Sequence, residues 1–321
     1  MYAAVLHTLG STPRYEEFPE PLIADKDREV IVQVHAASLK PIDKQLAGGS
    51  HYASHGELPR VCGSDGVGHL DGGQRVFFGG PRPPHGAMAQ RTVVPRAFTF
   101  PVPENVSDDT ASALPNPGVS AWLSLAYRAR LVRGENVLIL GATGVTGKLS
   151  VKIAKLLGAA RAVAAGRNQR ILNTLPNLGA DATISLALPP SELREAFLQQ
   201  AGQSGFHVVI DYVWGGPAET FLAAITRGEF SAIQSETRFV QVGETAAPAI
   251  TLPAAVLRST ALTIMGTAGI PPRPVLAEAF QQVMAYAAKG ELQIDTERVP
   301  LAHIENAWQS DQSGRRLVII P

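Results

Sequence analysis

The chain has 321 residues and one cysteine, and its 28 lysines and arginines balance its 28 aspartates and glutamates, so its formal net charge is zero. A single cysteine excludes a disulfide framework within the chain and a cysteine-rich structural zinc site. The charge balance argues against nucleic acid or an anionic membrane as the main partner.

No membrane or export signal is visible in the sequence. No apolar run approaches the ~20 residues that a membrane-spanning helix needs. Residues 1–10 lack the basic start and apolar core of a signal peptide. We therefore expect a soluble, cytoplasmic protein of about two domains.

The first third of the chain predicts a β-rich domain. Pairs of glycines and prolines separate short alternating runs that are typical of strands, at residues 30–34, 75–78 and 91–94. Near Asp108 the pattern changes: Ser107 is predicted to cap a helix that residues 115–118, Pro-Asn-Pro-Gly, then break.

From Val119 onward, predicted strands alternate with predicted helices. The strands are 136–140, 161–165, 182–184, 208–211 and 239–242, and the helices are 147–157, 169–178 and 191–201, the last capped by Ser191. One helix (275–289) and one strand (317–320) follow. The alternation indicates a parallel sheet covered on both faces. The prediction is a doubly wound α/β domain (119–266) inserted into a β-rich domain formed by residues 1–118 and 267–321.

A glycine-rich turn between the first of these strands and its helix is the strongest functional signal. Gly141, Gly144 and Gly147 are spaced G-x-x-G-x-x-G, and this context is typical of a turn that lets backbone N–H groups approach a diphosphate. The predicted cofactor-binding residues are Gly141, Ala142, Thr143, Gly144, Val145, Thr146 and Gly147. The alternative is an ordinary strand–helix turn with packing glycines.

The end of the next strand indicates which dinucleotide binds. It carries Gly166, Arg167 and Asn168, with Arg170 nearby, and no acid that would bind a ribose 2′-hydroxyl. An arginine suits a 2′-phosphate, so the sequence favours NADPH over NADH. The alternative is that Arg167 is a solvated surface residue.

Several segments resemble one known family. They are residues 37–43, 59–68, 71–76, 86–90, 136–147, 156–159 and 178–181. Together they resemble the zinc-independent quinone oxidoreductase (zeta-crystallin-like) branch of the medium-chain dehydrogenase/reductase superfamily. The resemblance implies a Rossmann domain inserted in a GroES-like, partly open barrel, an NADPH cofactor, and reduction of quinones or other conjugated carbonyls. It also implies a homodimer through edge strands around residues 252–265.

The zinc ligands of related enzymes have no counterpart at the matching positions. Lys40, Ser64-Asp65 and Asn116 stand there, and none of them forms a good zinc site. His51 and His55 could chelate a metal on a helix, but the glycines around them favour a loop. The expectation is hydride transfer without a metal.

Metal-free reduction still needs a donor for the negative charge that develops on the substrate oxygen. By the resemblance, Tyr52 matches a tyrosine of the family, while Lys40 departs from the asparagine that the family often has there; our hypothesis is that Lys40 or Tyr52 is the catalytic donor. The alternative for Lys40 is an ion pair with Asp43 or a surface position, and the alternative for Tyr52 is an aromatic residue that only packs on the substrate.

The resemblance also implies cofactor contacts outside the turn. These are Ser120, Asp211, Tyr212, Val242, Gly243 and Arg315, with Arg316 as an alternative to Arg315 and a surface charge as the alternative for both. Two other functions stay open: an enoyl-thioester reductase on the same fold, and a non-catalytic NADPH-binding sensor or structural protein.

Overall fold

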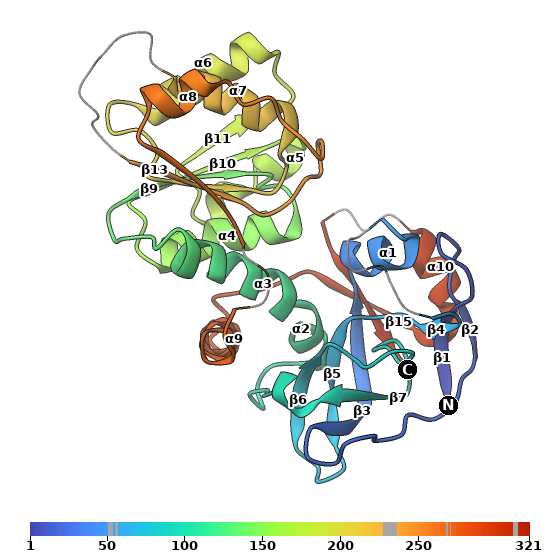
Figure 1. Cartoon of the computed structure of the whole chain (residues 1–321). Helices are drawn as coiled ribbons and strands as arrows, with labels where there is room; N and C mark the ends of the chain where they lie inside the picture. The colour runs from blue at the N-terminus through green and yellow to red at the C-terminus, as the bar shows by residue number, and fades with distance from the viewer. Residues whose placement is uncertain (51–53, 55–56, 227–235, 268, 270, 311–313) are drawn as a thin grey trace. The chain divides into compact units, whose positions relative to one another are not determined.

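The computed structural model describes residues 1–50, 54, 57–226, 236–267, 269, 271–310 and 314–321. The chain forms two compact units (Figure 1). Unit 1 comprises Met1–Asn116 and Pro272–Pro321, and unit 2 comprises Pro117–Pro271. Both ends of the chain therefore belong to the same unit.

Unit 2 is built on a six-stranded parallel sheet. Its order is β11 (Ala182–Ser185), β10 (Arg161–Gly166), β9 (Asn136–Leu140), β12 (Val208–Asp211), β13 (Thr237–Gln241) and β14 (Leu262–Gly266). The chain moves outward from β9 to β11 and then returns to β12 on the other side of β9. The carboxyl ends of β9 and β12 therefore flank a topological switch point, where such sheets bind ligands.

Helices cover both faces of this sheet. Figure 1 shows α4 (Val145–Leu156) on one side, and α6 (Pro190–Ala201), α7 (Gly215–Ile225) and α8 (Ala254–Ser259) on the other. The central strands are almost wholly apolar and buried, as expected for strands covered on both faces. The remaining helical segments are α3 (Pro115–Trp122), η2 (Leu123–Arg128), α5 (Gln169–Leu172) and η3 (Leu175–Leu178).

Unit 1 is built mainly from antiparallel strands. A seven-stranded sheet runs in the order β15 (Thr296–Pro300), β16 (Arg316–Ile320), β3 (Glu29–Leu39), β5 (Asp65–Leu70), β6 (Arg75–Gly79) and β8 (Thr99–Pro101), with β7 (Arg91–Pro95) also paired to β3. A smaller sheet contains β2 (Arg14–Glu17), β1 (Tyr2–Leu6) and β4 (Arg60–Val61). The helical segments are α1 (Pro41–Gly48), η1 (Arg96–Phe98), α2 (Asp108–Ala113), α9 (Arg273–Ala288), η4 (Leu301–His303) and α10 (Ile304–Gln309).

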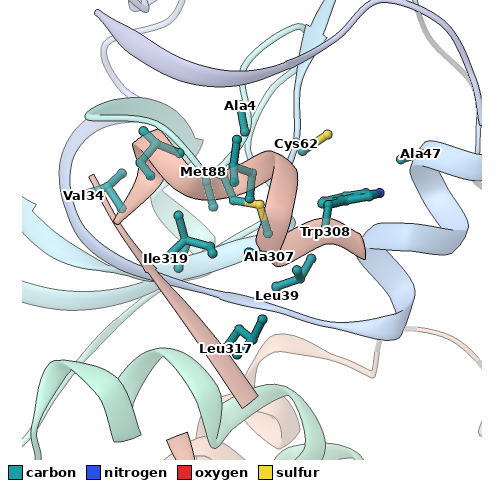
Figure 2. Close-up of a cluster of buried hydrophobic side chains, with 14 of the residues drawn as sticks. Ala4, Val34, Leu39, Ala47, Cys62, Met88, Ala307, Trp308, Leu317 and Ile319 are labelled. Atoms are coloured by element: carbon teal, nitrogen blue, oxygen red, sulfur yellow. The ribbon is translucent and has the colours of Figure 1, made fainter. Parts of the chain in front are cut away.

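The two ends of the chain meet in the core of unit 1. Met88 and Leu39 from the first third pack with Trp308 and Ile319 from the C-terminal segment (Figure 2). The single cysteine, Cys62, belongs to this cluster, and burial raises the pKa of its thiol to about 12. The C-terminal segment is therefore part of this core.

The predicted fold class is confirmed, and two local predictions were wrong because of proline. Residues 169–178 form α5 and the short η3 in place of one helix, because Pro176 has no N–H for an α-helical bond. α6 begins at Pro190 without a side-chain cap from Ser191. The helix capped by Ser107, α2, ends at Ala113 before Pro115, as predicted, and a second helix that was not predicted, α3, begins at Pro115, where the first-turn N–H groups need no helical partner. β15 and α10 were not predicted at all.

Candidate active site

The glycine-rich turn joins β9 to α4 in a conformation that needs glycine. Gly141 has φ +88°, and a β-carbon there would lie 3.0 Å from Val213 Cγ1. The N–H groups of Gly141 and Ala142 both donate to the carbonyl of Ala165, at 2.9 and 2.8 Å. The start of the turn is therefore fixed to the neighbouring strand β10.

Gly144 and Gly147 differ in what surrounds them. A β-carbon on Gly147 would lie 2.3 Å from the carbonyl oxygen of Gly141, so this glycine is required by packing of the helix against the turn. A β-carbon on Gly144 would meet only that same oxygen, at 3.5 Å. Gly144 is the N-cap of α4, with φ −78°, so neither its backbone nor its neighbours demand glycine. The open space beside Gly144 fits a group bound at the N-terminus of the helix.

The predicted 2′-phosphate region follows β10 in the sheet. A β-carbon on Gly166 would lie 2.4 Å from Thr143 Cγ2, so the strand end packs closely on the turn. Asn168 caps α5 by accepting a hydrogen bond from Ile171 N at 3.2 Å. Arg167 and Arg170 are both exposed, and neither has a hydrogen bond or ion pair to a residue that the structure describes. An exposed, unpaired arginine in this position fits a phosphate, and these residues are therefore compatible with NADPH.

Asp211 organises the loop at the end of β12. Its Oδ1 accepts hydrogen bonds from Val213 N at 2.8 Å and Trp214 N at 3.0 Å. The carboxylate is fully buried, and its Oδ2 has no hydrogen-bond partner. Burial raises the pKa of Asp211 to about 6, although the two backbone N–H groups oppose this effect. Trp214 has φ +56°, a conformation that is strained for a residue with a side chain. The carboxylate therefore holds a strained loop beside the glycine-rich turn.

Three further predicted residues lie at the same edge of the sheet. Val242 N and Gly243 N both donate to the carbonyl of Asp211, at 2.8 and 3.1 Å. The hydroxyl groups of Tyr212 and Ser150 are 2.6 Å apart, which ties the loop to α4. Burial raises the pKa of Tyr212 above its usual range.

The other residues predicted around the turn also lie in unit 2. Thr146 accepts a hydrogen bond from Ser150 Oγ through its carbonyl at 3.0 Å, in the first turn of α4 beside Val145. Ser120 lies in α3 and is half-buried. The carbonyl oxygen of Ser120 accepts a hydrogen bond from Ser124 Oγ at 2.8 Å.

In unit 1, Lys40 lies in a buried ion cluster. Its side chain is 1% exposed, and its Nζ donates to Ser38 O at 2.8 Å and to Asp65 Oδ1 at 2.9 Å. Asp43 Oδ2 lies 3.2 Å from the same nitrogen. Burial alone would lower the pKa of Lys40, but the two carboxylates outweigh it and raise the pKa above its ordinary value. The ammonium is therefore charged, and these three acceptors take up its three N–H groups.

The remaining predicted residues of unit 1 differ from one another. Tyr52 lies outside the described residues. Arg315 is half-exposed and pairs with Glu297 on the surface, Nε to Oε2 at 2.7 Å. In the described part of the chain, no group of three or more His, Cys, Asp or Glu side chains is arranged to hold a metal. At the positions matched to zinc ligands, Lys40 is ion-paired and Asn116 is exposed.

Comparisons with known proteins agree with this architecture. The chain is 26% identical to a probable NADPH-dependent quinone reductase, tdiC, of Emericella nidulans, over the full length of both chains. It is 30% identical to a segment of the highly reducing polyketide synthase PKS2 of Leptosphaeria maculans, covering 67% of this chain and 8% of that protein. A mycobacterial quinone oxidoreductase superposes over the whole of both chains with a TM-score of 0.85 and 20% identity, which confirms the fold. No family model matches the chain.

The chain is a relative of the quinone oxidoreductases of the medium-chain dehydrogenase/reductase superfamily. The resemblance to quinone oxidoreductases inferred from the sequence segments is therefore confirmed, and hydride transfer without a metal stays a prediction.

The predicted nucleotide-binding residues that follow β9, β10, β12 and β13 lie at one edge of the unit 2 sheet, whereas Arg315 lies in unit 1. The sequence did not reveal that Asp65 is an ion-pair partner of Lys40. Of the two arginines considered near the C-terminal strand, Arg315 was preferred, but Arg316 is the buried one. The signal for Arg316 was its position directly before the apolar run 317–320, as the first residue of β16.

Proposed function

We propose that the protein is an NADPH-dependent oxidoreductase that reduces quinones or other α,β-unsaturated carbonyl compounds by hydride transfer, without a metal. One observation carries the cofactor assignment: the space beside Gly144 is open while Arg167, after the next strand, is exposed and unpaired among the described residues. The full-length similarity to a quinone reductase supports the reaction.

Each part of unit 2 has a role in this proposal. The N-terminus of α4 and the backbone of the turn hold the diphosphate, since helix N-termini favour negative charge. Arg167 holds the 2′-phosphate with Asn168 and Arg170 beside it. Asp211, Tyr212, Val242, Gly243 and Ser120 shape the region around the nicotinamide. NADPH, when bound, supplies the hydride.

Two residues of unit 1 were predicted to donate to the substrate oxygen. The ammonium of Lys40 already has three acceptors, so within this proposal it acts as a charge partner of Asp43 and Asp65. Tyr52 stays a predicted donor. Tyr52→Phe should lower kcat/KM and leave NADPH affinity unchanged, because only the phenolic O–H is lost; an unchanged kcat/KM would exclude that role.

The cofactor assignment is tested with Arg167→Ala. Loss of one charge-assisted hydrogen bond costs about 1.5–3 kcal/mol, so the preference for NADPH over NADH should fall at least roughly 10- to 100-fold. Arg194→Ala, at another exposed arginine of unit 2, is the matched control and should leave the preference unchanged. Equal affinities for NADPH and NADH in the parent protein would refute the assignment.

The reaction is tested by following the nicotinamide absorbance with a panel of quinones, enones and acyl thioesters. Turnover of quinones or enones, unchanged after dialysis against a chelator, is the expected result. Turnover with acyl thioesters alone would favour an enoyl-thioester reductase, the alternative that the polyketide synthase similarity supports. Tight NADPH binding without any turnover would favour a sensor.

We also propose a homodimer that works in the cytoplasm. β14 is the last strand of the six-stranded sheet, and Thr263 on it is exposed, so a second copy can pair with this edge. Thr263→Pro should block that pairing and give a monomer in analytical ultracentrifugation; a parent protein that sediments as a monomer would refute the dimer. No helix among the described residues is long and apolar enough to cross a membrane.

A further inference from the structure

Two histidines of unit 1 meet on the surface of the seven-stranded sheet. His35 lies on β3 and His69 on β5, and the Nδ1 atom of His69 is 3.1 Å from the Nε2 atom of His35. The two rings are tilted by 53°, with their centroids 4.4 Å apart. The side chain of His35 is 32% exposed and His69 is half-buried, so small ions can reach the pair from solvent.

An irregularity in β3 determines the position of His35. The pairing of β3 with β5 shifts its register between Val34 and Ala36, so His35 is an extra residue without a partner on β5. Such a β-bulge changes the direction of the side chain that it carries. Val34 and Ala36 are buried, whereas His35 is partly exposed. Both imidazole rings are therefore held by the backbone of one sheet before any ligand binds.

A carboxylate lies beside the other nitrogen of His35. It belongs to Asp108, the first residue of α2, a helix that packs on β3 and β5 (Figure 1). Asp108 Oδ2 lies 3.4 Å from His35 Nδ1. Asp108 Oδ1 accepts hydrogen bonds from Arg75 Nε at 2.8 Å and from Arg75 Nη2 at 2.5 Å, which fix the carboxylate. Its negative charge favours the tautomer of His35 with hydrogen on Nδ1, which leaves a lone pair on Nε2, the atom beside His69.

This arrangement has the chemistry of a transition-metal site. A histidine that binds a metal usually directs its other ring N–H at a carboxylate, as His35 does towards Asp108. Two nitrogens that each lie about 2.0–2.1 Å from one ion are about 2.9 Å apart at a right angle and about 3.4 Å apart in a tetrahedron, and the observed 3.1 Å lies between these values. Imidazole nitrogens suit zinc, copper and nickel. The described residues supply no third His, Cys, Asp or Glu ligand, so water completes the coordination.

We propose that His35 Nε2 and His69 Nδ1 together bind one divalent transition-metal ion. Each nitrogen contributes a lone pair, and the hydrogen on Nδ1 of His69 in the metal-free pair moves through solvent to its Nε2, so both rings stay neutral. The bound ion connects the bulge of β3 to β5. The site is separate from the positions that match the zinc ligands of related enzymes, Lys40, Ser64-Asp65 and Asn116, and it needs neither NADPH nor a substrate.

The experiment measures metal binding to the full chain and to four variants, each first dialysed against a chelator. Zn²⁺ is titrated by isothermal calorimetry, and Cu²⁺ is followed by electron paramagnetic resonance, in which each bound nitrogen splits the signal. His35→Gln and His69→Gln each remove one ligand, and Asp108→Asn removes the charge that orients His35. His303→Gln is the matched control, since His303 is an exposed histidine of unit 1 on η4.

The expected results follow from a site that needs both histidines. Asp108→Asn should weaken Zn²⁺ binding roughly 10- to 100-fold, as loss of a carboxylate behind a metal ligand does elsewhere, and His35→Gln and His69→Gln should weaken it by at least that factor. The Cu²⁺ signal should show two nitrogens in the parent and fewer in both histidine variants. Zn²⁺ should raise the melting temperature of the parent and of His303→Gln, but not that of His69→Gln.

Three results would overturn the inference. One is a parent without saturable binding of Zn²⁺ or Cu²⁺, in which case the histidines form only a hydrogen-bonded pair. Another is a Kd of Zn²⁺ within about twofold of the parent in His35→Gln and His69→Gln, which decide the question if Asp108→Asn does not fold. The last is loss of Zn²⁺ binding in the double variant His51→Gln/His55→Gln and not in His69→Gln, which would assign the ion to those two histidines.

Discussion

Replacing Lys40 by methionine removes a charge from the centre of a buried cluster. The variant loses hydrogen bonds of 2.8 Å to Ser38 O and 2.9 Å to Asp65 Oδ1, and the ion pair with Asp43 at 3.2 Å. Two buried carboxylates then face one cation, Arg316. Breaking a buried ion pair by removing one partner costs about 3–5 kcal/mol, so we expect unit 1 to lose that much unfolding free energy.

Urea unfolding of three variants measures this loss. Lys40→Met/Asp65→Asn restores charge neutrality and should recover part of the stability. Arg315→Met breaks the half-exposed pair with Glu297 and should cost less than about 1 kcal/mol. If Lys40→Met costs no more than Arg315→Met does, Lys40 is not the centre of the cluster and the reasoning is wrong.

Two further predictions concern unit 2. Gly144→Ala should leave the melting temperature nearly unchanged and weaken NADPH binding, because its β-carbon enters the space beside the turn. Gly147→Ala should lower the free energy of unfolding by about 1–3 kcal/mol, because its β-carbon collides with the turn. The reverse pattern in thermal scans and NADPH titrations would contradict the roles given to these two glycines. The pKa of Asp211 is raised from an ordinary value of 3.8 to about 6 in the fold, so ionisation of this carboxyl destabilises the folded state above pH 6 and has no effect below pH 4. Asp211→Asn should therefore gain about 3 kcal/mol relative to the parent between pH 4 and pH 7, measured by urea unfolding at both pH values; a constant difference would exclude the shift.

The sequence was most informative where backbone geometry depends on local residues. Residues 136–140 and 208–211 were predicted as strands, and β9 and β12 have those bounds. Strong apolar runs between turn residues leave little choice of structure. Proline can end one helix and begin the next: Pro115 does both, and only its second role was missed, as was the start of α6 at Pro190.

The buried ion cluster could not be predicted because its members come from distant parts of the chain. Lys40 and Asp43 are neighbours on α1, but Asp65 begins β5 and Arg316 begins β16. Only the pairing of β16 and β5 with β3 brings them together. Lys40 was therefore open to three interpretations, as a donor, an ion-pair partner of Asp43 or a surface residue, until its acceptors were known. The roles of Lys40, Tyr52 and the cofactor-binding residues stay predictions.

The burial of Cys62 gives the protein an internal reporter. The thiol lies in the core of unit 1, and unit 2 has no cysteine. With its pKa raised to about 12, the folded thiol has almost no thiolate at neutral pH. Alkylation therefore proceeds only through molecules whose core has opened, and its rate measures that opening equilibrium. The stability of unit 1 can thus be followed in the intact chain by alkylation of this one native thiol, and no reporter residue has to be introduced.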